Sequence, residues 1–219
     1  MGVTPVLAAA LAGIPSGIQR QGVWAGRRQV FIRFAGAAET AQMYTADALA
    51  RELTRALGRT VYHSVCVTGR DSFGNAEFLA AALKQLPAGT EVMADTDGQR
   101  PEALAILHPY ISLIQVTLEP PVASPALERV VETLRAAASL GCATAITIAG
   151  TDESSDADYL QIVDQVHDAN GATGIVIHPG PTAERGVLDK RWSTLMEHAS
   201  ARHRDLRLLA RLSGPATMR

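Results

Sequence analysis

Apolar runs and amphipathic segments alternate along almost the whole chain. The first run, residues 29–35, is rich in β-branched and aromatic side chains without helical spacing, and it predicts a strand. Gly36 ends this strand, and a helix that begins near Thr45 then carries a leucine at every fourth position. Residues 36–44, between the strand and the helix, are predicted to form a loop.

The same strand-then-helix pattern continues to the end of the chain. Each later strand is a short apolar run, and each later helix keeps its apolar side chains on one face. Before the first strand, residues 1–26 are punctuated by glycine and proline, and we expect a short helix and then an extended lead-in there. Further strands are predicted at residues 61–68, 91–95, 111–118, 142–148, 173–178 and 206–210, and further helices at 75–86, 101–107, 124–140, 157–169 and 188–203.

Strands that alternate with helices pair in parallel, because each helix returns the chain to the edge where the next strand starts. Six such units can form an open doubly wound sheet or an incomplete (β/α) barrel, and both folds bind ligands at the carboxyl ends of the strands. No internal repeat or linker interrupts the series. We therefore predict an α/β protein with a lead-in at residues 1–26 and a single domain at residues 27–219.

Composition excludes several classes of partner. The net charge of −2 argues against a general nucleic-acid binder, which is usually distinctly basic. The apolar run at residues 6–13 is too short to span a membrane and lacks the basic region of a signal peptide. Cys66 and Cys142 both lie within apolar runs, as expected of buried thiols in a reducing compartment. We expect a cytoplasmic protein that binds neither nucleic acid nor membrane.

Polar side chains stand where two of the predicted strands end. Asp95, Thr96 and Asp97 lie at the end of the third strand, and they could bind an amine, a ribose or a divalent cation, or form a solvated turn. His178 ends the sixth strand as an acid–base group, a ligand or a turn-capping histidine. We take Asp95, Asp97 and His178 as the candidate catalytic residues.

Two arginines are candidate contacts for an anionic ligand. Arg33 lies inside the first strand, and Arg70 lies just beyond the second. Together they could bind an anion, although a solvent-facing role is the alternative for both. Because an arginine inside a barrel needs a carboxylate partner, we also expect an ion pair between Arg33 and an acidic side chain on a neighbouring strand.

Five short segments match, in order, the motifs of one enzyme family. G-I-Q-R-Q-G at residues 17–22 is similar to S-I-Q-G-E-G, and residues 26–36 are similar to G-R-x-x-x-F-I-R-x-A-G. V-C-V-T-G at residues 65–69 is similar to V-S-V-T-G, A-D-T-D-G at 94–98 to E-T-N/D-G, and I-H-P at 177–179 aligns with a Q-P pair. The series resembles the radical S-adenosylmethionine (SAM) enzymes, specifically the 7-carboxy-7-deazaguanine synthases.

The resemblance implies an incomplete (β/α)6-type TIM barrel of the radical SAM kind, often dimeric in this family. It also implies a [4Fe–4S] cluster, SAM, Mg²⁺ and a pterin substrate. Gln19 matches a residue of the family's substrate-binding lead-in, and residues 69–72 stand where the family's G-G-E-P holds the methionyl amine of SAM. The candidate ligand-binding residues are Gln19, Arg33, Gly69, Arg70, Asp71 and Thr96.

The cluster positions depart from the family pattern. Its C-x3-C-x2-C falls on Ala37, Ala41 and Tyr44, and none of these supplies the thiolate that a [4Fe–4S] cluster needs. Without a cluster no electron reaches SAM, so we expect neither the radical reaction nor a bound metal.

A non-radical pseudoenzyme is therefore predicted, acting as a ligand-binding or partner subunit. It would take a small-molecule or nucleotide-like ligand, or pair as a homodimer or as a heteromer with an active relative. The alternative is a cluster-independent enzyme that uses acid–base chemistry, as a lyase, isomerase or transferase, on a small polar or nucleotide-like substrate. Binding of SAM without a cluster is a third reading.

Overall fold

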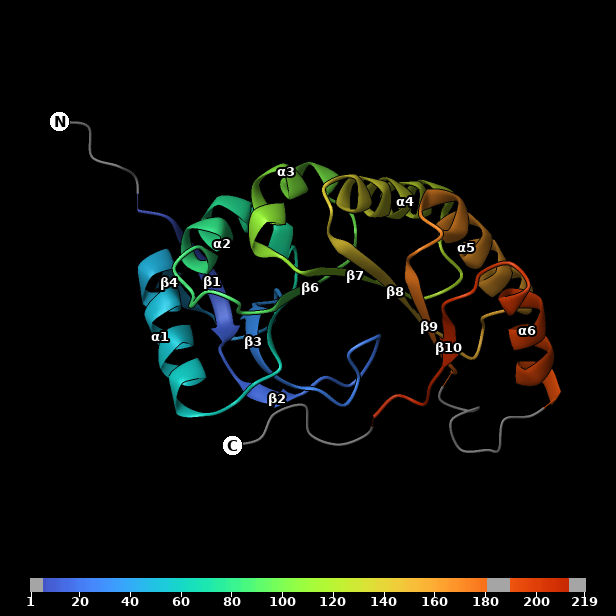
Figure 1. Cartoon of the computed structure of the whole chain (residues 1–219), viewed down its shortest axis with the longest axis horizontal. Coiled ribbons are helices and arrows are strands. Elements are labelled where there is room, and N and C mark those ends of the chain that lie inside the picture. Colours follow the sequence, from blue (N-terminus) through green and yellow to red (C-terminus); the bar gives the residue numbers. More distant parts are fainter. Residues whose placement is uncertain (1–5, 181–189, 213–219) are drawn as a thin grey trace.

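One curved sheet organises the computed structural model, which describes residues 6–180 and 190–212. Within those residues ten strands form the sheet in the order β10-β9-β8-β7-β6-β5-β3-β1-β4, with β2 paired to β3 (Figure 1). The strands from β3 to β10 along this order run parallel to one another. These parallel strands are β3 (Arg28–Phe34), β5 (Ser64–Gly69), β6 (Val92–Thr96), β7 (Leu113–Leu118), β8 (Ala143–Ala149), β9 (Gly174–His178) and β10 (Leu206–Leu208).

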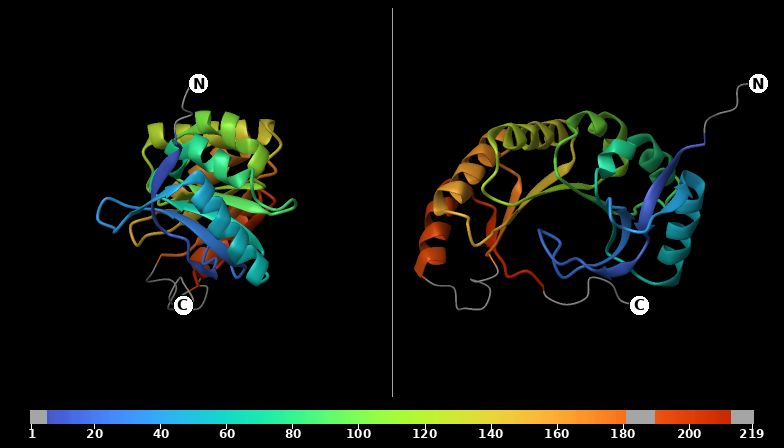
Figure 2. Two further views of the ribbon diagram at one scale, coloured as in Figure 1. Left: turned by 90° about the vertical axis from the view of Figure 1, so that its left-hand side faces the viewer. Right: turned by 180° about the vertical axis from the view of Figure 1, so that it is seen from behind.

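Helices cover only the convex side of this sheet. Every helix that the structure describes lies outside the crescent, and the concave side faces a hollow (Figures 1 and 2). A doubly wound sheet would carry helices on both faces, so the arrangement is that of a partial, barrel-like α/β fold. The helices are α1 (Ala46–Arg59), α2 (Ala76–Leu83), α3 (Leu104–Leu107), α4 (Ser124–Ser139), α5 (Asp156–Ala169) and α6 (Lys190–Ser200), with 3-10 turns at Ser72–Asn75, Pro101–Ala103 and His108–Tyr110.

The repeating strands and helices that the sequence predicts are confirmed, with ends that differ by a few residues. Residues 188 and 189 of the last predicted helix lie outside the described residues. The helix start near Thr45 is confirmed by its cap, because the Thr45 hydroxyl accepts a hydrogen bond from the Ala48 N–H at 3.2 Å. Both cysteines are buried and free, as expected. In the described ranges no helix has the length and apolar character needed to cross a membrane.

Two expectations near the N-terminus are wrong. The short helix expected before the lead-in is instead a strand, β1 (Ala8–Gly13), and the loop at residues 36–44 ends in a strand, β4 (Gln42–Thr45). β1 runs antiparallel to β3 and β4 antiparallel to β1, while β2 (Ser16–Ile18) also runs antiparallel to β3. Alanine and leucine favour helix intrinsically, but the free edge of β3 pairs with this segment and overrides the local preference.

Alternation along each strand separates the hydrophobic core from the hollow. In β3, Val30, Ile32 and Phe34 are buried in the core beneath the helices. The intervening Phe31 and Arg33 line the concave side. Because successive side chains of a strand point to opposite faces, β3 contributes apolar groups to the core and the candidate residue Arg33 to the concave side.

Gly69 ends β5 where the backbone of β3 lies closest. Its φ is 101°, and a Cβ added there would lie 2.3 Å from the carbonyl oxygen of Phe34. We expect Gly69→Ala to lower the free energy of unfolding by about 2 kcal/mol or more, because it combines a left-handed backbone with a steric clash. Urea unfolding followed by circular dichroism measures this change.

Gly89 provides the matched control. Its φ is 79°, but an added Cβ would meet nothing within 4 Å, so Gly89→Ala carries only the backbone strain. Equal losses of stability in the two variants would contradict the close approach of β3 and β5 at Gly69.

Candidate functional site

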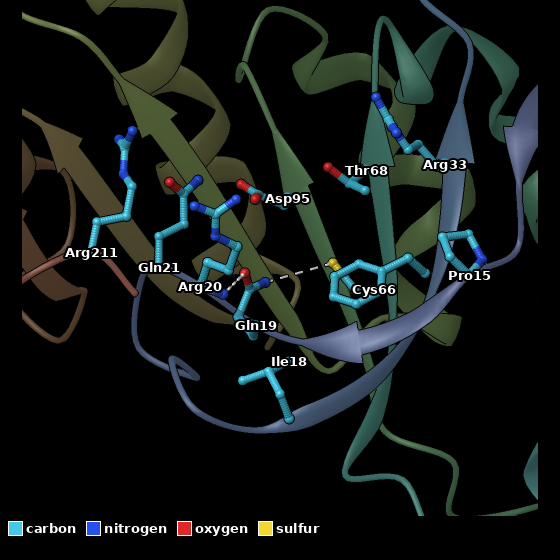
Figure 3. A pocket seen from close by; sticks show the side chains of 11 residues that line it. Pro15, Ile18, Gln19, Arg20, Gln21, Arg33, Cys66, Thr68, Asp95 and Arg211 are labelled. Atoms are coloured by element: carbon cyan, nitrogen blue, oxygen red, sulfur yellow. Dashed lines mark hydrogen bonds between the residues drawn. The ribbon is translucent and has the colours of Figure 1, made fainter. Parts of the chain in front are cut away.

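A cavity opens on the concave side at the carboxyl ends of β3, β5 and β6 (Figure 3). Its volume is about 380 Å³, within the range of roughly 300–1,000 Å³ that is common for small-molecule sites. Ligands of parallel barrels bind at this end of the strands. The cavity is lined by Pro15, Ile18, Gln19, Arg20, Gln21, Phe31, Arg33, Cys66, Thr68, Asp95 and Arg211.

The last part of the lead-in, residues 19–26, crosses the hollow and forms one wall of this cavity (Figure 1). The Val23 N–H donates to the Gln115 side-chain oxygen at 3.2 Å, and the Gly22 N–H donates to the His178 ring at 3.1 Å. Gly22 has a φ of 76°, and an added Cβ would lie 1.9 Å from the Gln115 oxygen. Only glycine therefore allows the lead-in to lie this close to β7.

Asp95, next to the last residue of β6, lies in the cavity lining. The Thr117 hydroxyl donates to its carboxylate at 2.8 Å, and the Gln21 amide donates to the Thr117 hydroxyl at 3.2 Å. Burial raises the pKa of Asp95, and hydrogen bonds from its neighbours, that of Thr117 foremost, oppose part of this rise. Asp95 is thus a carboxyl group held in one orientation by side chains from the lead-in and β7.

Gln19 and Cys66 meet beside Asp95. The Gln19 side chain is buried, and its amide nitrogen lies 3.9 Å from the Cys66 sulfur while its amide oxygen accepts from the Arg20 N–H at 2.9 Å. Burial raises the pKa of the Cys66 thiol well above its ordinary value, with the nearby Asp95 charge as a second cause. Cys66 is therefore a protonated, buried part of the cavity floor and not a reactive thiolate.

Arg33 lies at the rim of the cavity. The prediction that its ion-pair partner lies on a neighbouring strand is wrong. Arg33 forms an ion pair with Glu39, in the loop after its own strand, and not with a carboxylate on a neighbouring strand. Half of the Arg33 side chain is exposed. The carboxyl end of β3 reaches solvent at the mouth of the cavity. Arg33 is therefore not a buried charge, and it does not need a carboxylate partner inside the barrel.

Arg20 and Arg211 line the same cavity, although no motif or strand end in the sequence selects them. Arg20 lies in the lead-in next to Gln19, and its Nε donates to the carbonyl oxygen of Leu212 at 2.8 Å. Arg211 comes from the segment after β10. Only tertiary structure brings these two arginines to one place, because 191 positions separate them along the chain.

Gly69, Arg70 and Asp71 do not line the cavity. Arg70 is exposed, and Asp71 has a left-handed backbone with a φ of 46°. Arg100 binds both oxygens of the Asp71 carboxylate, and this hydrogen bonding holds the pKa of Asp71 below its ordinary value. The Asp71 carboxylate already has a cationic partner in the next βα turn.

Thr96 and Asp97 form a turn. A turn was the alternative to a ligand-binding role for these residues in the sequence analysis. The buried Thr96 hydroxyl accepts from the Gly98 N–H at 3.2 Å, and the exposed Asp97 carboxylate accepts from the Gln99 N–H at 3.0 Å. Neither side chain lines the cavity. Asp97 is therefore separated from Asp95 by the turn of the chain, and the two carboxylates do not act as a pair.

His178 connects three segments of the structure. It is fully buried, its Nδ1 lies 2.7 Å from the Leu209 carbonyl oxygen, and its Nε2 accepts from the Gly22 N–H. A carbonyl oxygen only accepts hydrogen bonds, so Nδ1 carries the proton of a neutral ring. His178 thus positions the lead-in and the segment after β10, and it is not part of the cavity lining.

The three residues that match cluster positions lie in different surroundings. Ala37 and Ala41 are exposed in the loop, whereas Tyr44 is partly buried in β4 opposite Ala9 of β1. No three side chains of histidine, cysteine, aspartate or glutamate within the described ranges are grouped so that they could hold a metal ion.

The raised pKa of Asp95 predicts a pH-dependent stability. Because the folded pKa lies above the ordinary value of 3.8, the folded state binds more protons than the unfolded state between the two pKa values. The free energy of unfolding then falls as the pH rises through this window. We expect Asp95→Asn to remove this fall, so that the variant gains stability relative to the wild type from about pH 4 upward.

Urea unfolding at a series of pH values measures this difference. Asp97→Asn is the control, because Asp97 is exposed, and it should keep the pH profile of the wild type. A constant difference between Asp95→Asn and the wild type at all pH values would contradict a raised pKa at Asp95.

No family model matches the chain. Over 125 residues the chain is 28% identical to a 7-carboxy-7-deazaguanine synthase, a radical SAM enzyme, of Methanothermobacter thermautotrophicus. The aligned region covers 49% of this chain and 49% of the synthase, so the chain spans about half the length of the curated relative that it matches. The resemblance seen in the sequence motifs is thus supported as a distant similarity to part of a radical SAM synthase.

Proposed function

We propose that this chain is a non-radical, ligand-binding relative of the 7-carboxy-7-deazaguanine synthases, with a partial barrel of the radical SAM kind. One observation carries the proposal. The concave side retains a cavity of about 380 Å³ around a positioned carboxyl group, Asp95, while Ala37, Ala41 and Tyr44 occupy the positions that match the family's cluster cysteines. The chain thus combines a cavity that is large enough for a small molecule with a loop that contains no thiolates.

The residues present do not fit a [4Fe–4S] cluster. Such a cluster is held by cysteine thiolates, and these 219 residues contain two cysteines. Cys66 lies in β5 and Cys142 just before β8, and burial raises the pKa of both thiols. Neither belongs to the loop before α1, so the chain supplies no ligand set for a cluster there.

SAM is a weaker candidate ligand than a molecule that fits the cavity itself. The Asp71 carboxylate stands nearest to the position of the family's amine-binding glutamate, but Arg100 already binds both of its oxygens. Arg70 adds a further cation at this turn. An ammonium group would therefore have to displace an existing ion pair, which argues for a ligand that is held by the cavity around Asp95.

The cluster-independent enzyme is not favoured by the geometry. Asp95, Asp97 and His178 would have to share one site, but Asp97 forms an exposed turn and both ring nitrogens of His178 have backbone partners. A general base must reach the proton that it removes. Asp95 alone of the three residues faces the cavity.

Self-association through the sheet edge is part of the proposal. In the described part of the chain β4 forms one end of the sheet, and Met43 in this strand is 65% exposed. An edge strand presents unpaired backbone groups to a second strand. We expect light scattering to give the mass of a dimer for the wild type and of a monomer for Met43→Lys. A wild-type monomer at all concentrations would contradict pairing with a second copy.

Cluster loss is tested by anaerobic reconstitution with ferrous iron and sulfide. We expect a colourless protein, because the loop before α1 lacks thiolates. An active radical SAM enzyme treated in parallel provides the positive control. A brown protein with the absorption spectrum of a [4Fe–4S] cluster would overturn the proposal.

Ligand binding is tested by thermal unfolding with SAM, its breakdown products, deazapurines, pterins and nucleotides. A bound ligand at about 100 times its Kd adds about 2.7 kcal/mol to the free energy of unfolding. We expect at least one compound to raise the Tm of the wild type and of Asp97→Asn, and to lose most of its effect in Asp95→Ala. No rise with any compound, or an equal rise in Asp95→Ala, would count against binding in this cavity.

A further inference from the structure

Two histidines meet on the outer side of the sheet, away from the cavity. His167 lies in the last turn of α5, and His203 lies in the turn after α6, at one end of the crescent (Figure 1). The Nδ1 atoms of the two rings are 3.3 Å apart, and the ring planes cross at 85°. Neither histidine lines the cavity around Asp95, so the proposed function does not use this pair.

The ring of His203 is fixed through its other nitrogen. His203 is 1% exposed, and its Nε2 lies 2.6 Å from the carbonyl oxygen of Thr173. Because a carbonyl oxygen only accepts hydrogen bonds, Nε2 carries the proton of the neutral ring, and Nδ1 presents a lone pair to His167. Histidines that bind metal ions are commonly oriented in this way, with one nitrogen donating to a carbonyl oxygen and the other nitrogen binding the metal.

His167 brings the second nitrogen from the solvent side. Its side chain is exposed. In the neutral pair, the Nδ1–H group of His167 donates to the lone pair on Nδ1 of His203. When water moves this proton from Nδ1 to Nε2, His167 becomes the other neutral tautomer and gains a lone pair on Nδ1. Both Nδ1 atoms can then bind one cation, and the pair loses no net proton.

The separation of the two nitrogens matches that of two ligands of one metal ion. Two histidine nitrogens that bind a tetrahedral Zn²⁺ at 2.0–2.1 Å lie roughly 3.3–3.4 Å apart. The two Nδ1 atoms already have this separation. Turning the rings to aim both lone pairs at the ion is therefore the adjustment that binding requires, and the exposed His167 ring can make it.

We propose that His167 and His203 bind a divalent transition-metal ion such as Zn²⁺. Imidazole nitrogens suit Zn²⁺, Cu²⁺ and Ni²⁺, whereas Mg²⁺ and Ca²⁺ prefer oxygen ligands. Within the described ranges no third histidine, cysteine, aspartate or glutamate completes a set of three, so water occupies the remaining positions on the ion. This site differs in place and in ligand type from an iron–sulfur cluster at the loop before α1.

The charges beside the two histidines are balanced. Asp164, one turn before His167 on α5, forms an ion pair with Arg202 at 2.9 Å. Asp168 and Arg204, which follow the two histidines in the chain, carry opposite charges. The imidazole nitrogens, and not a surplus of carboxylates, therefore determine the affinity. Binding should accordingly distinguish Zn²⁺ from Mg²⁺, although the two ions carry the same charge.

A bound ion would connect two elements of the last βα unit. It would join the end of α5 to the turn that leads from α6 into β10. The two nitrogens come together only in the folded chain, because 36 positions separate them in the sequence. A metal ion that binds the folded state in this way stabilises it, so Zn²⁺ should raise the Tm.

The experiment is an isothermal titration of the full chain, freed of metals by dialysis against a chelator, with zinc chloride. We expect one Zn²⁺ per chain, and no binding of Mg²⁺ in a parallel titration. Cu²⁺ then reports the ligands, because its electron paramagnetic resonance spectrum resolves coupling to the nitrogens that bind it. We expect coupling to two imidazole nitrogens.

Variants locate the ion. His167→Gln should weaken Zn²⁺ binding by about tenfold or more, abolish the rise in Tm and leave Cu²⁺ with one coupled imidazole nitrogen at this site. His203→Gln should do the same. Because His203 is buried and could be needed for folding, the exposed His167 carries the test if that variant does not fold. His198→Gln is the matched control, since His198 is an exposed histidine on α6 and should not change the affinity.

Three results would overturn the metal site. The first is no binding of Zn²⁺ to the wild type, and the second is an unchanged affinity in His167→Gln. The third is an equal loss of affinity in His198→Gln, because the ion would then be held by scattered surface histidines. None of these results bears on the cavity around Asp95, so this inference and the proposed function can fail separately.

Discussion

The rest of the site depends on the hydrogen bonds that hold the lead-in against the concave face of the sheet. Helices cover only the outer face of the sheet, so the inner face would be open to solvent without another segment. Backbone hydrogen bonds from Gly22 and Val23 to His178 and Gln115 hold the lead-in across the hollow. Gln19, Arg20 and Gln21 thereby become the wall that faces Asp95. The cavity is a property of this crossing and not of the sheet alone.

The parallel strands and their helices could be predicted because each is specified locally. Strands covered by helices on one side and by the lead-in on the other read as apolar runs, and β5 to β9 are of this kind. β1 and β4 could not be predicted in this way, because Ala8–Gly13 has no strand signal of its own. Ala8–Gly13 is extended because it pairs with β3. β3 is distant in the sequence, so a prediction from neighbouring residues does not include this pairing.

The site was predictable in part for the same reason. Asp95 and Arg33 stand at strand ends, and the parallel topology brings such ends together. Arg20 and Arg211 carry no comparable signal, since a loop and the segment after the last strand contribute them. His178 also stands at a strand end, but its contacts are with Gly22 and Leu209, which no spacing in the sequence connects to it.

The strand β4 constrains where side chains of the loop before α1 can lie. From Ala41 to Tyr44 the chain enters the extended conformation, and three extended residues span roughly 10 Å. Ligands of one cluster must instead converge on a single point. Placing cysteines at positions 37, 41 and 44 would therefore leave them apart unless the pairing of β4 with β1 were also undone. The pairing of β4 with β1 therefore limits, through the backbone, where side chains at these three positions can lie.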